Sequence, residues 1–540
     1  MREWRSVAAL ALAGALCSGA ALADAARPEV APARFQIERA DGDGVPLSGR
    51  LLLFAVDAKS ATAAAPDGKV EHLDASPFGN VQTAVAAREV THWLPGKGVE
   101  LNADDQAFPS AWSQLPAGDY LVQALLDGNH DYNYTGRGPG DLVSEVVPVH
   151  LPATTAPVLK LTRTLPASEP WTLSPRAPEA MRQALPEARK HTESLDFVSP
   201  ALSAFWGRPI HMRGWVVLPP GYDAKGSQRY PVVYTTHGFG GNLQRYTSSV
   251  ISTWSDMAAG RTPPMIWVFL DESSATGTHE FADSVNNGPW GQALTTELIP
   301  HLESTYRMDG KANGRFLTGH SSGGWATLWL QTRYPAVFGG TWSTAPDSSD
   351  FHDFTGVDLY APDANVYHRA DGSAYPLVRD KGKVLASFEA FARLEAVLGE
   401  YGGQMGSFDW VFSPRGADGR PVPMFDRATG KVDPAVVQYW RDHYDIAHRV
   451  QANWPQLKGD LDGKVHLIVG TADTFYLDGA AHRLKAVMDG LGAKSDFRFL
   501  PDRTHFDLLA EGDDRMALMR QFAWEMYAVA RPQSTLKPAP

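Results

Sequence analysis

The sequence has a single cysteine, Cys17, and lacks both a long apolar run and an excess of basic residues. One cysteine excludes an internal disulfide framework and a cysteine-rich metal site. A membrane-spanning helix needs about 20 consecutive apolar residues, and no stretch of the sequence provides them. Lys and Arg number 49 against 61 Asp and Glu, a formal net charge of −12. Since binding to a nucleic acid backbone needs the opposite sign, we expect neither a membrane span nor a nucleic acid partner.

The first 23 residues have the pattern of a secretory signal peptide. Arg2 and Arg5 form a basic start, Val7 to Leu16 an apolar run, and Ala21-Leu22-Ala23 a cleavage site of small residues. The apolar run is about half the length of a spanning helix, which argues against an anchor. We therefore expect a periplasmic or secreted protein that loses Cys17, and with it its only thiol, on maturation.

The chain of 540 residues is longer than one typical domain. Residues 30–164 have the pattern of an all-β domain. Short strands separated by turn residues are expected at 50–56, 119–126, 142–149 and 158–161. This pattern predicts a β-sandwich domain. Residues 165–199, rich in Pro, Ala and Glu, are expected to be a linker or packed connecting helices.

Residues 200–535 follow a different pattern, in which continuous apolar strands alternate with helices. The strands are expected at 214–218, 230–236, 264–270, 315–318 and 464–469, and a helix at 290–306. Strands that are apolar throughout are typical of sheets covered on both faces. The alternation predicts an α/β fold with a mostly parallel sheet. Residues 346–451, with a helix at 388–400, interrupt it as an insertion that we expect to cap the site.

A pentapeptide in this half carries the candidate nucleophile. Gly319-His320-Ser321-Ser322-Gly323 matches G-x-S-x-G, follows an apolar strand and precedes a helix-compatible segment. In that context the serine lies on a sharp strand-to-helix turn, where glycines avoid steric clashes. Ser321 is the predicted nucleophile; Ser322, one position off the motif, is its rival.

Acyl transfer also needs backbone N–H groups that stabilise the developing oxyanion, one of them from the residue after the nucleophile. Ser322 would supply this first donor. The second is expected from His237-Gly-Phe-Gly-Gly241, which ends an apolar strand, with Phe239 or Gly240 as the donor. His237 precedes the serine, and the chain order Ser, acid, His argues against it as the base.

The base and the acid are expected after the last strands. His505 follows the strand 495–500 on a loop, whereas His466 lies within a strand and His482 within a helical segment. The acid should end the penultimate strand, where it can fix the tautomer of the histidine. Asp473 in Gly470-Thr-Ala-Asp473 meets this condition; Asp478 and Asp507 remain alternatives.

With these residues placed, the half from Ile210 to Ala530 resembles the putative esterase family of the α/β-hydrolase superfamily. The segments that carry the resemblance are His237–Gly241, Gly319–Gly324 and Gly470–Asp473. That family includes S-formylglutathione hydrolase, enterochelin esterase, feruloyl esterase modules and mycolyltransferases. The resemblance implies an α/β-hydrolase fold and assigns the three segments to oxyanion hole, nucleophile and acid. The 346–451 insertion and the N-terminal domain depart from the simplest members.

Three weaker patterns accompany the triad. The segment from Asp127 to Asn133 spaces its oxygen ligands as a calcium loop does. However, Tyr132 stands in place of the turn glycine and Gly138 in place of the bidentate glutamate. These departures favour a solvated hairpin tip without a metal ion. Asp271 and Asp347 each follow an apolar strand at the edge where the site is expected. They would bind a polar substrate group or, as such residues commonly do, cap their own loops.

The sequence thus predicts an exported serine esterase that needs no cofactor and cleaves a small-molecule or saccharide ester through an acyl-enzyme. Acyl transfer or peptide cleavage by the same triad stays open, because pocket shape selects the acceptor. A non-catalytic carbohydrate-binding protein is the third alternative. The filled triad positions argue against it.

Overall fold

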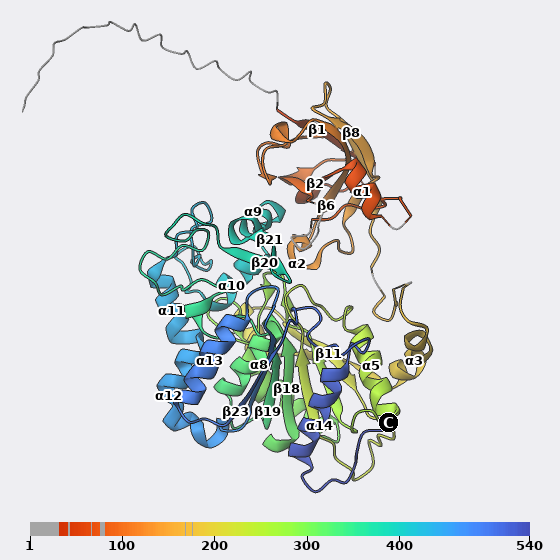
Figure 1. Cartoon of the computed structure of the whole chain (residues 1–540). Helices are drawn as coiled ribbons and strands as arrows, with labels where there is room; N and C mark the ends of the chain where they lie inside the picture. The colour runs from red at the N-terminus through yellow and green to blue at the C-terminus, as the bar shows by residue number, and fades with distance from the viewer. Residues whose placement is uncertain are drawn as a thin grey trace, which may run out of the picture.

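A computed structural model of the chain describes residues 32–40, 44–65, 67–75, 82–167, 169–174 and 176–539. It has an N-terminal β domain and a larger α/β domain, which appear at the top and bottom of Figure 1. The expected signal peptide, residues 1–23, lies outside the described residues. Within the described ranges, no helix combines the length and apolarity needed to cross a bilayer.

The N-terminal domain is built on one hydrogen-bonded sheet of nine strands, in the order β4-β1-β9-β7-β6-β2-β3-β5 with β8 paired to β6. The strands are β1 (Arg34–Arg39), β2 (Leu47–Asp57), β3 (Ala84–Trp93), β4 (Val99–Asn102), β5 (Ala107–Phe108), β6 (Gly118–Asp127), β7 (Leu142–Ser144), β8 (Val147–Leu151) and β9 (Val158–Thr164). β1 and β9 pair in parallel, and the neighbouring β7 and β9 are antiparallel. Because the strands form one continuous sheet, the expected sandwich of two separate sheets is not confirmed.

Strand β2 shows why this domain does not stand alone. Leu51, Leu53 and Ala55 point into the core of the domain, where Phe35 and Trp112 lie. The alternate residues Leu52, Phe54 and Val56 belong to an apolar cluster on the opposite face, which also contains Leu394, Val397 and Leu398 of helix α9 (Phe388–Leu398). Side chains alternate between the two faces of a strand, so an uninterrupted apolar run means that both faces are covered.

The α/β domain is centred on an eight-stranded sheet in the order β10-β11-β13-β12-β18-β19-β22-β23. The strands are β10 (Thr192–Val198), β11 (His211–Val217), β12 (Val232–Thr236), β13 (Ile266–Leu270), β18 (Arg315–His320), β19 (Gly340–Thr344), β22 (Val465–Gly470) and β23 (Ser495–Leu500). β10, β11 and β13 pair antiparallel, and the strands from β13 to β23 pair in parallel. The expectation of a mostly parallel sheet is therefore corrected to a mixed one.

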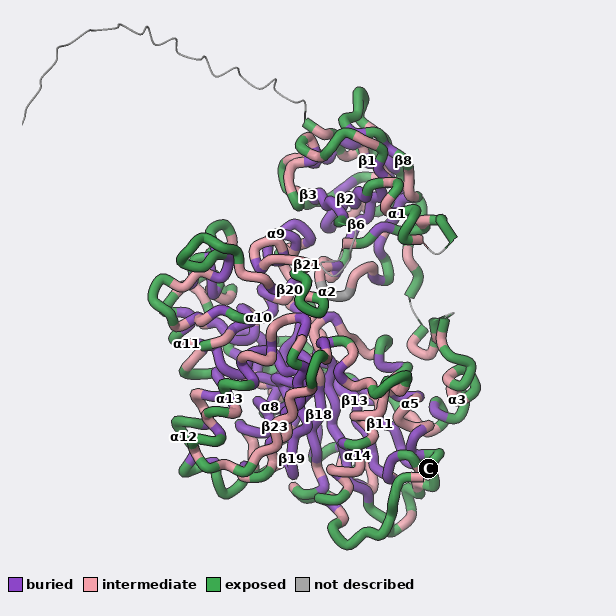
Figure 2. The backbone as a smooth tube through the Cα atoms, viewed as in Figure 1, coloured by how far each residue is buried: buried purple, intermediate pink, exposed green. Residues whose placement is uncertain are grey.

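Two apolar clusters cover the faces of this sheet, which is the buried centre of Figure 2. The alternation is visible in β12, where Val233 belongs to one cluster and Val232 and Tyr234 to the other. The long helices are α3 (Glu179–Lys190), α5 (Thr247–Ala258), α8 (Ser322–Arg333), α12 (Ile446–Leu461), α13 (Asp478–Gly490) and α14 (Ala517–Ala530). Helix α8 contributes to both clusters, which fixes the nucleophile turn at its start within the core.

Two segments differ from their expected boundaries. β10 lies within the expected linker 165–199 and forms an edge of the catalytic sheet; with only Leu195 buried it lacks the apolar run of a central strand. The expected helix 290–306 is divided into α6 (Trp290–Ala293), a π-helical turn (Leu294–Leu298) and α7 (Ile299–Thr305).

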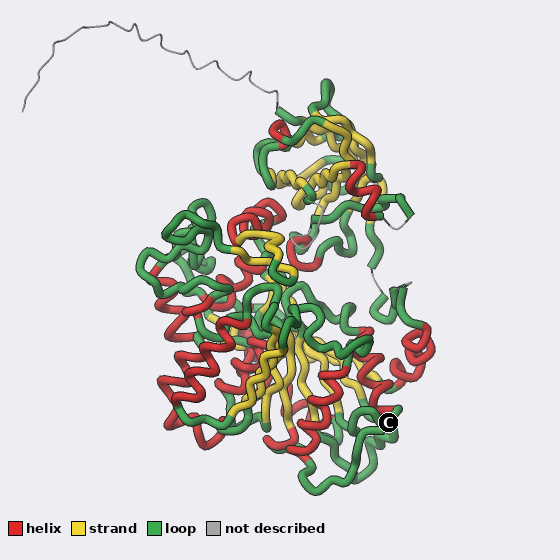
Figure 3. The backbone as a smooth tube through the Cα atoms, in the orientation of Figure 1, coloured by secondary structure: helices red, strands yellow, loops and turns green. Residues whose placement is uncertain are grey.

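The insertion 346–451 forms the layer of helices and one small sheet that adjoins the N-terminal domain in Figure 3. Its elements are β20 (Pro376–Asp380), β21 (Lys383–Ser387), α9, α10 (Gln404–Phe412), α11 (Pro434–Tyr444) and the start of α12. The expected helix 388–400 corresponds to α9. The insertion shares an apolar cluster with the catalytic sheet, and its helix α9 also belongs to a cluster of the N-terminal domain.

Candidate active site

Ser321 occupies a strained turn between β18 and α8. Its backbone has φ 60° and ψ −126°, a conformation that costs on the order of 1–3 kcal/mol for a residue other than glycine. The neighbouring glycines make the turn possible: a Cβ on Gly319 would lie 2.2 Å from the Gly323 carbonyl oxygen, and one on Gly323 would lie 2.5 Å from the His237 oxygen. The G-x-S-x-G spacing therefore reflects backbone contacts that exclude side chains.

The loop after β12 lies against this turn. A Cβ on Gly238 would lie 2.9 Å from the Cβ of Ser321, so only glycine allows the approach. Phe239 and Gly240 line the same cavity as Ser321. Ser322 is the first residue of α8, a position whose N–H has no acceptor within the helix. The three residues expected to donate to an oxyanion are thus gathered around the Ser321 turn.

His237 anchors this loop, and both of its ring nitrogens contact residues other than Ser321. Its Nε2 contacts Asp271 Oδ1 at 3.0 Å, and its Nδ1 contacts the Gly238 oxygen at 2.9 Å. Burial disfavours the charged ring, but the carboxylates of Asp271 and Glu272 outweigh it and raise the pKa of His237. Asp271 also accepts from Ser273 at its own loop, as expected for a capping residue.

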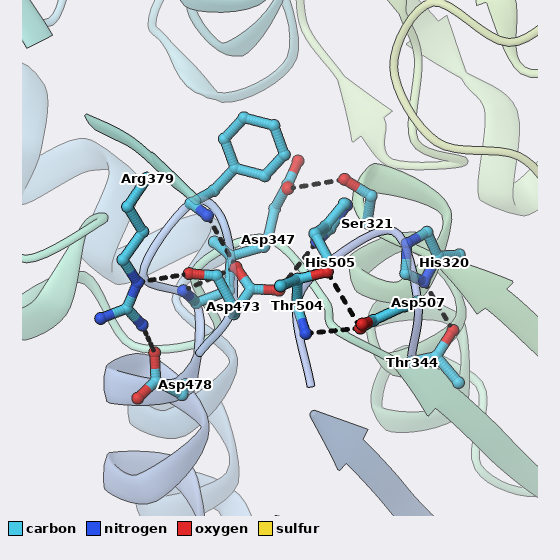
Figure 4. Close-up of polar contacts among 12 residues, drawn as sticks. His320, Ser321, Thr344, Asp347, Arg379, Asp473, Asp478, Thr504, His505 and Asp507 are labelled. Carbon is cyan, nitrogen blue, oxygen red and sulfur yellow. Dashed lines mark hydrogen bonds and ion pairs between the residues drawn. The ribbon is translucent and has the colours of Figure 1, made fainter. Parts of the chain in front are cut away.

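His505 and Asp473 form a buried pair. His505 Nδ1 contacts Asp473 Oδ2 at 2.8 Å, as Figure 4 shows, and the side chains are 4% and 0% exposed. The other oxygen of Asp473 accepts from the backbone N–H of Phe475 and Leu477. Burial alone would favour the neutral acid, yet the histidine and these N–H donors lower the pKa of Asp473. The pair is held by donors that favour an ionised Asp473.

The alternative acids have other partners. Asp478 forms an ion pair with Arg379 at 3.1 Å, and Asp507 accepts from the backbone N–H of Thr504 at 2.6 Å. Both contacts are drawn in Figure 4. Asp478 thus begins α13 beside Arg379, and Asp507 caps the loop that carries His505. Of the three aspartates, Asp473 is the one that contacts the histidine.

The side chains of the alternative histidines also contact other residues. His466 stacks on Trp342 with ring centroids 4.1 Å apart, and His482 stacks on Phe499 at 3.7 Å. His320 packs against His505 at 4.3 Å, and burial lowers its pKa to about 3. A neutral His320 therefore supports the ring of His505 without adding a second charge.

Asp347 is a site residue whose contact the sequence does not reveal. It accepts from the hydroxyl of Ser322 at 2.6 Å and from that of Ser321 at 3.5 Å. Its position just after β19, the strand beside β18, was the available signal. Among the described residues, Ser321 makes no direct hydrogen bond to His505, although both line one cavity. Catalytic hydrogen bonds are often long or absent before the substrate binds.

The segment 127–133, weighed above as a calcium loop, is a capped turn. Asp127 is 1% exposed, and its two oxygens accept from the backbone N–H of Asn129 and Tyr132. Tyr132 is buried and begins the short helix α2 (Tyr132–Thr135). Gly128 and Asn129 at the hairpin tip are exposed, as expected, whereas Asp127 and Tyr132 on either side of them are buried. No cluster of three metal-ligating side chains occurs in the described ranges.

The cavity above Ser321 and His505 has a volume of about 920 Å³. The α/β domain lines it with Phe239, Phe475 and Phe506, and the insertion with Phe391, Leu394, Leu398 and Gln404. The N-terminal domain lines it as well, through residues between Glu71 and Leu165. Such a volume is at the upper end of the range for sites that bind small molecules, about 300–1,000 Å³.

Comparison with known proteins identifies a family that matches this chain. The family model described as putative esterase matches residues 206–478, which include Ser321 and Asp473 and end before His505. Esterase Rv1288 of Mycobacterium tuberculosis is 31% identical over 148 residues, covering 26% of this chain and 31% of the relative. The chain thus matches less than a third of that relative's length.

Solved structures are similar at lower identity. The ferulic acid esterase of Anaeromyces mucronatus is 13% identical with a TM-score of 0.34, covering 63% of this chain and 91% of its own. S-formylglutathione hydrolase of Agrobacterium tumefaciens is 15% identical with a TM-score of 0.36, covering 63% and 95%.

Proposed function

The chain belongs to the putative esterase family, and from this premise we propose that it is an exported serine esterase that hydrolyses a carboxylic ester through an acyl-enzyme on Ser321. The observation that carries the proposal is the convergence on one cavity of Ser321, on its strained turn, and His505, held by Asp473. Nucleophile, acid and base stand in the order Ser, Asp, His along the chain.

The first half-reaction acylates Ser321. The hydroxyl rotates from Asp347 toward His505, its oxygen attacks the ester carbonyl carbon, and its proton passes to His505 Nε2. Asp473 accepts from Nδ1–H, which leaves Nε2 as the basic nitrogen and stabilises the charged ring. The oxyanion is stabilised by the backbone N–H of Ser322 and that of Phe239 or Gly240. The ester C–O bond then breaks, and His505 returns the proton to the departing alcohol.

The second half-reaction releases the acid. A water molecule attacks the acyl-enzyme carbon while His505 takes one of its protons, and the same N–H donors stabilise the second oxyanion. When the bond to Ser321 breaks, the proton on His505 returns to the serine oxygen. The substrate is an ester of a small molecule or saccharide, and no step needs a cofactor.

Fluorophosphonate labelling tests the nucleophile. We expect the wild type to be labelled at Ser321 and to cleave 4-nitrophenyl esters, and Ser321→Ala to lose both, with kcat lower by roughly 10⁶. Ser322→Ala is the matched control, since it removes the adjacent hydroxyl but leaves the backbone donor. Labelling that persists in Ser321→Ala, or that disappears only in Ser322→Ala, would contradict the assignment.

Export is supported by the basic start, apolar run and small residues of positions 1–23. The proposal is that cleavage follows Ala23 and that the mature protein acts in the periplasm or outside the cell. Peptide mapping of the protein from culture and cell fractions tests it. A cytoplasmic protein that retains residues 1–23 would refute export without affecting the esterase proposal.

A further inference from the structure

The cavity above Ser321 is completed by the N-terminal domain. The N-terminal domain lines the cavity with Ala75, Tyr132, Gly136 and Leu165 and with six further polar or charged residues, here called the N-terminal wall: Glu71, His72, Asp74, Asn133, Arg137 and Arg163. Ser321 and His505 line the same cavity from the α/β domain. Every substrate that fills the space above the nucleophile therefore contacts both domains.

The N-terminal wall is held in place by the domain contact itself. Arg50 donates to the Val397 carbonyl at 2.7 Å, and Asn133 donates to the carbonyls of Glu395 and Gly399 at 3.1 and 3.3 Å. Helix α9 contacts β3 and β5 beside these bonds and shares an apolar cluster with β2. Helix α9 lies next to the N-terminal strands in Figure 1. A contact that combines buried apolar area with hydrogen bonds fixes the wall relative to Ser321.

The two sides of the cavity differ in chemistry. The α/β domain and the insertion contribute most of the apolar side chains, of which Phe239, Phe391, Phe475 and Phe506 are the largest, together with the polar Arg245, Glu395 and Gln404. The N-terminal domain contributes the charged residues Glu71, Asp74, Arg137 and Arg163 and the polar His72 and Asn133, beside Ala75, Tyr132, Gly136 and Leu165. The cavity therefore suits an ester with an apolar part at the α/β side and a polar part at the N-terminal wall.

Among the charged side chains of the N-terminal wall, one cation has no ion-pair partner among the described residues. Asp74 is paired with Arg137 at 2.7 Å, and Glu71 with Lys69 at 3.0 Å. Arg137 also donates to Gln123 and to the Leu73 carbonyl, so it positions the segment 71–75. Arg163, near the end of β9, is exposed, and its side chain makes no hydrogen bond or ion pair with another described residue. Arg245, from the α/β domain, lines the same cavity.

We propose that the N-terminal domain selects esters that carry an anionic group, a carboxylate, phosphate or sulfate, and that Arg163 binds this group. The inference rests on the esterase function proposed above and names the class of its substrate. A guanidinium group suits these anions because it offers parallel N–H donors to two oxygen atoms. In a chain of net charge −12, an unpaired cation in the substrate cavity also provides local attraction for such a substrate.

Three esters that share one acyl group provide the test: 4-(butanoyloxy)benzoate, its neutral methyl ester and 4-(butanoyloxy)benzenesulfonate. For each ester the full-length enzyme is compared with Arg163→Gln, so that differences in intrinsic reactivity cancel. We expect Arg163→Gln to lower kcat/KM about tenfold for the anionic esters, mainly through KM, and to leave the methyl ester unchanged. Added salt should reduce the wild-type advantage, because an exposed charge is screened.

Lys160→Gln is the matched control, because Lys160 is an exposed cation on the same strand that pairs with Glu38 outside the cavity. It should leave all three esters unchanged. A loss with one anionic ester alone would identify that anion as the preferred class. Equal effects of Arg163→Gln on charged and neutral esters would overturn the proposal, whereas failure of the esterase function itself would appear as no turnover of any ester and no fluorophosphonate label on Ser321.

Discussion

Ser321 and Asp347 are joined twice: the Ser321 hydroxyl donates to the Asp347 carboxylate at 3.5 Å, and the backbone N–H of Asp347 donates to the Ser321 carbonyl at 3.2 Å. The carboxylate also accepts from the hydroxyl of Ser322 at 2.6 Å. Asp347 therefore holds both serines of the turn, and the Ser321 hydroxyl rests on a residue outside the triad. Burial, opposed in part by these hydroxyl donors, raises the pKa of Asp347 to about 6.

Asp347→Asn should change the pH dependence of stability. An acid whose folded pKa is raised from 3.8 to about 6 costs stability as pH rises through that interval, since the unfolded chain ionises it more easily. The variant removes this cost. Its free energy of unfolding relative to wild type should rise by about 2 kcal/mol between pH 4 and pH 8. Urea unfolding across this range measures the difference.

Glu272 and Glu280 titrate in both proteins, but the charge of Asp347 helps to raise their pKa, so the measured difference includes the loss of this coupling. A constant offset between wild type and Asp347→Asn at every pH would mean that the carboxyl has an ordinary pKa in the fold. The same variant should still be labelled at Ser321 by a fluorophosphonate, since the Asp473–His505 pair is unchanged.

Gly238→Ala should impair catalysis by displacing the oxyanion loop. The added Cβ would lie 2.9 Å from Ser321 Cβ and 3.0 Å from the His320 oxygen, so loop and turn must separate. Loss of one oxyanion donor costs about 10²–10³ in kcat. Steady-state kinetics on a 4-nitrophenyl ester measures the loss. Gly118→Ala, where the Cβ meets nothing within 4 Å, is the control, and equal activities of the two variants would count against the assigned loop.

Sequence patterns located the elements that carry strong local signals. The expected strands 214–218, 230–236, 264–270, 315–318 and 464–469 correspond to β11, β12, β13, β18 and β22, because strands covered on both faces have uninterrupted apolar runs. The helix at 388–400 is α9. The contact of Asp473 with His505 followed from the position of each residue after its strand.

Features that depend on tertiary contacts have no local sequence pattern that predicts them. β10 is an edge strand with one buried residue and was assigned to the linker. The apolar run of β2 indicates that both faces of the strand are covered. The helix α9, which belongs to the cluster on one of these faces, is more than 300 residues away in the chain. The contacts of Asp347 and the N-terminal wall likewise arise from packing between segments distant in sequence. Neither follows from periodicity.

Removing residues 24–164 should destabilise the α/β domain without removing its chemistry. Every triad residue lies after this segment, so small activated esters should still be cleaved. However, Leu394, Val397 and Leu398 of α9 lose their covering strands, which exposes apolar surface worth about 25 cal/mol per Å². The melting temperature should therefore fall, and Val397→Gln in the truncated chain should restore solubility.

Thermal unfolding and turnover of 4-nitrophenyl acetate, measured on the truncated chain with and without Val397→Gln, check this prediction. A soluble, folded truncation that does not cleave the small ester would contradict it. The N-terminal domain would then support the triad itself rather than the distal part of the cavity.

The last prediction separates Asp473 from Asp478. Asp473→Asn removes the carboxylate that holds His505 Nδ1–H and is expected to slow kcat by roughly 10⁴, as loss of the acid does in comparable triads. Acylation should remain detectable, because the nucleophile and the histidine are still present. Asp478 contacts Arg379, which donates to the Asp473 carbonyl at 2.7 Å, so Asp478→Asn only weakens a support of that loop and should cost less than about tenfold. Single-turnover acylation by a 4-nitrophenyl ester distinguishes the two variants. If Asp473→Asn keeps a near-normal rate while Asp478→Asn collapses, the acid is Asp478 and His505 must reorient during the reaction.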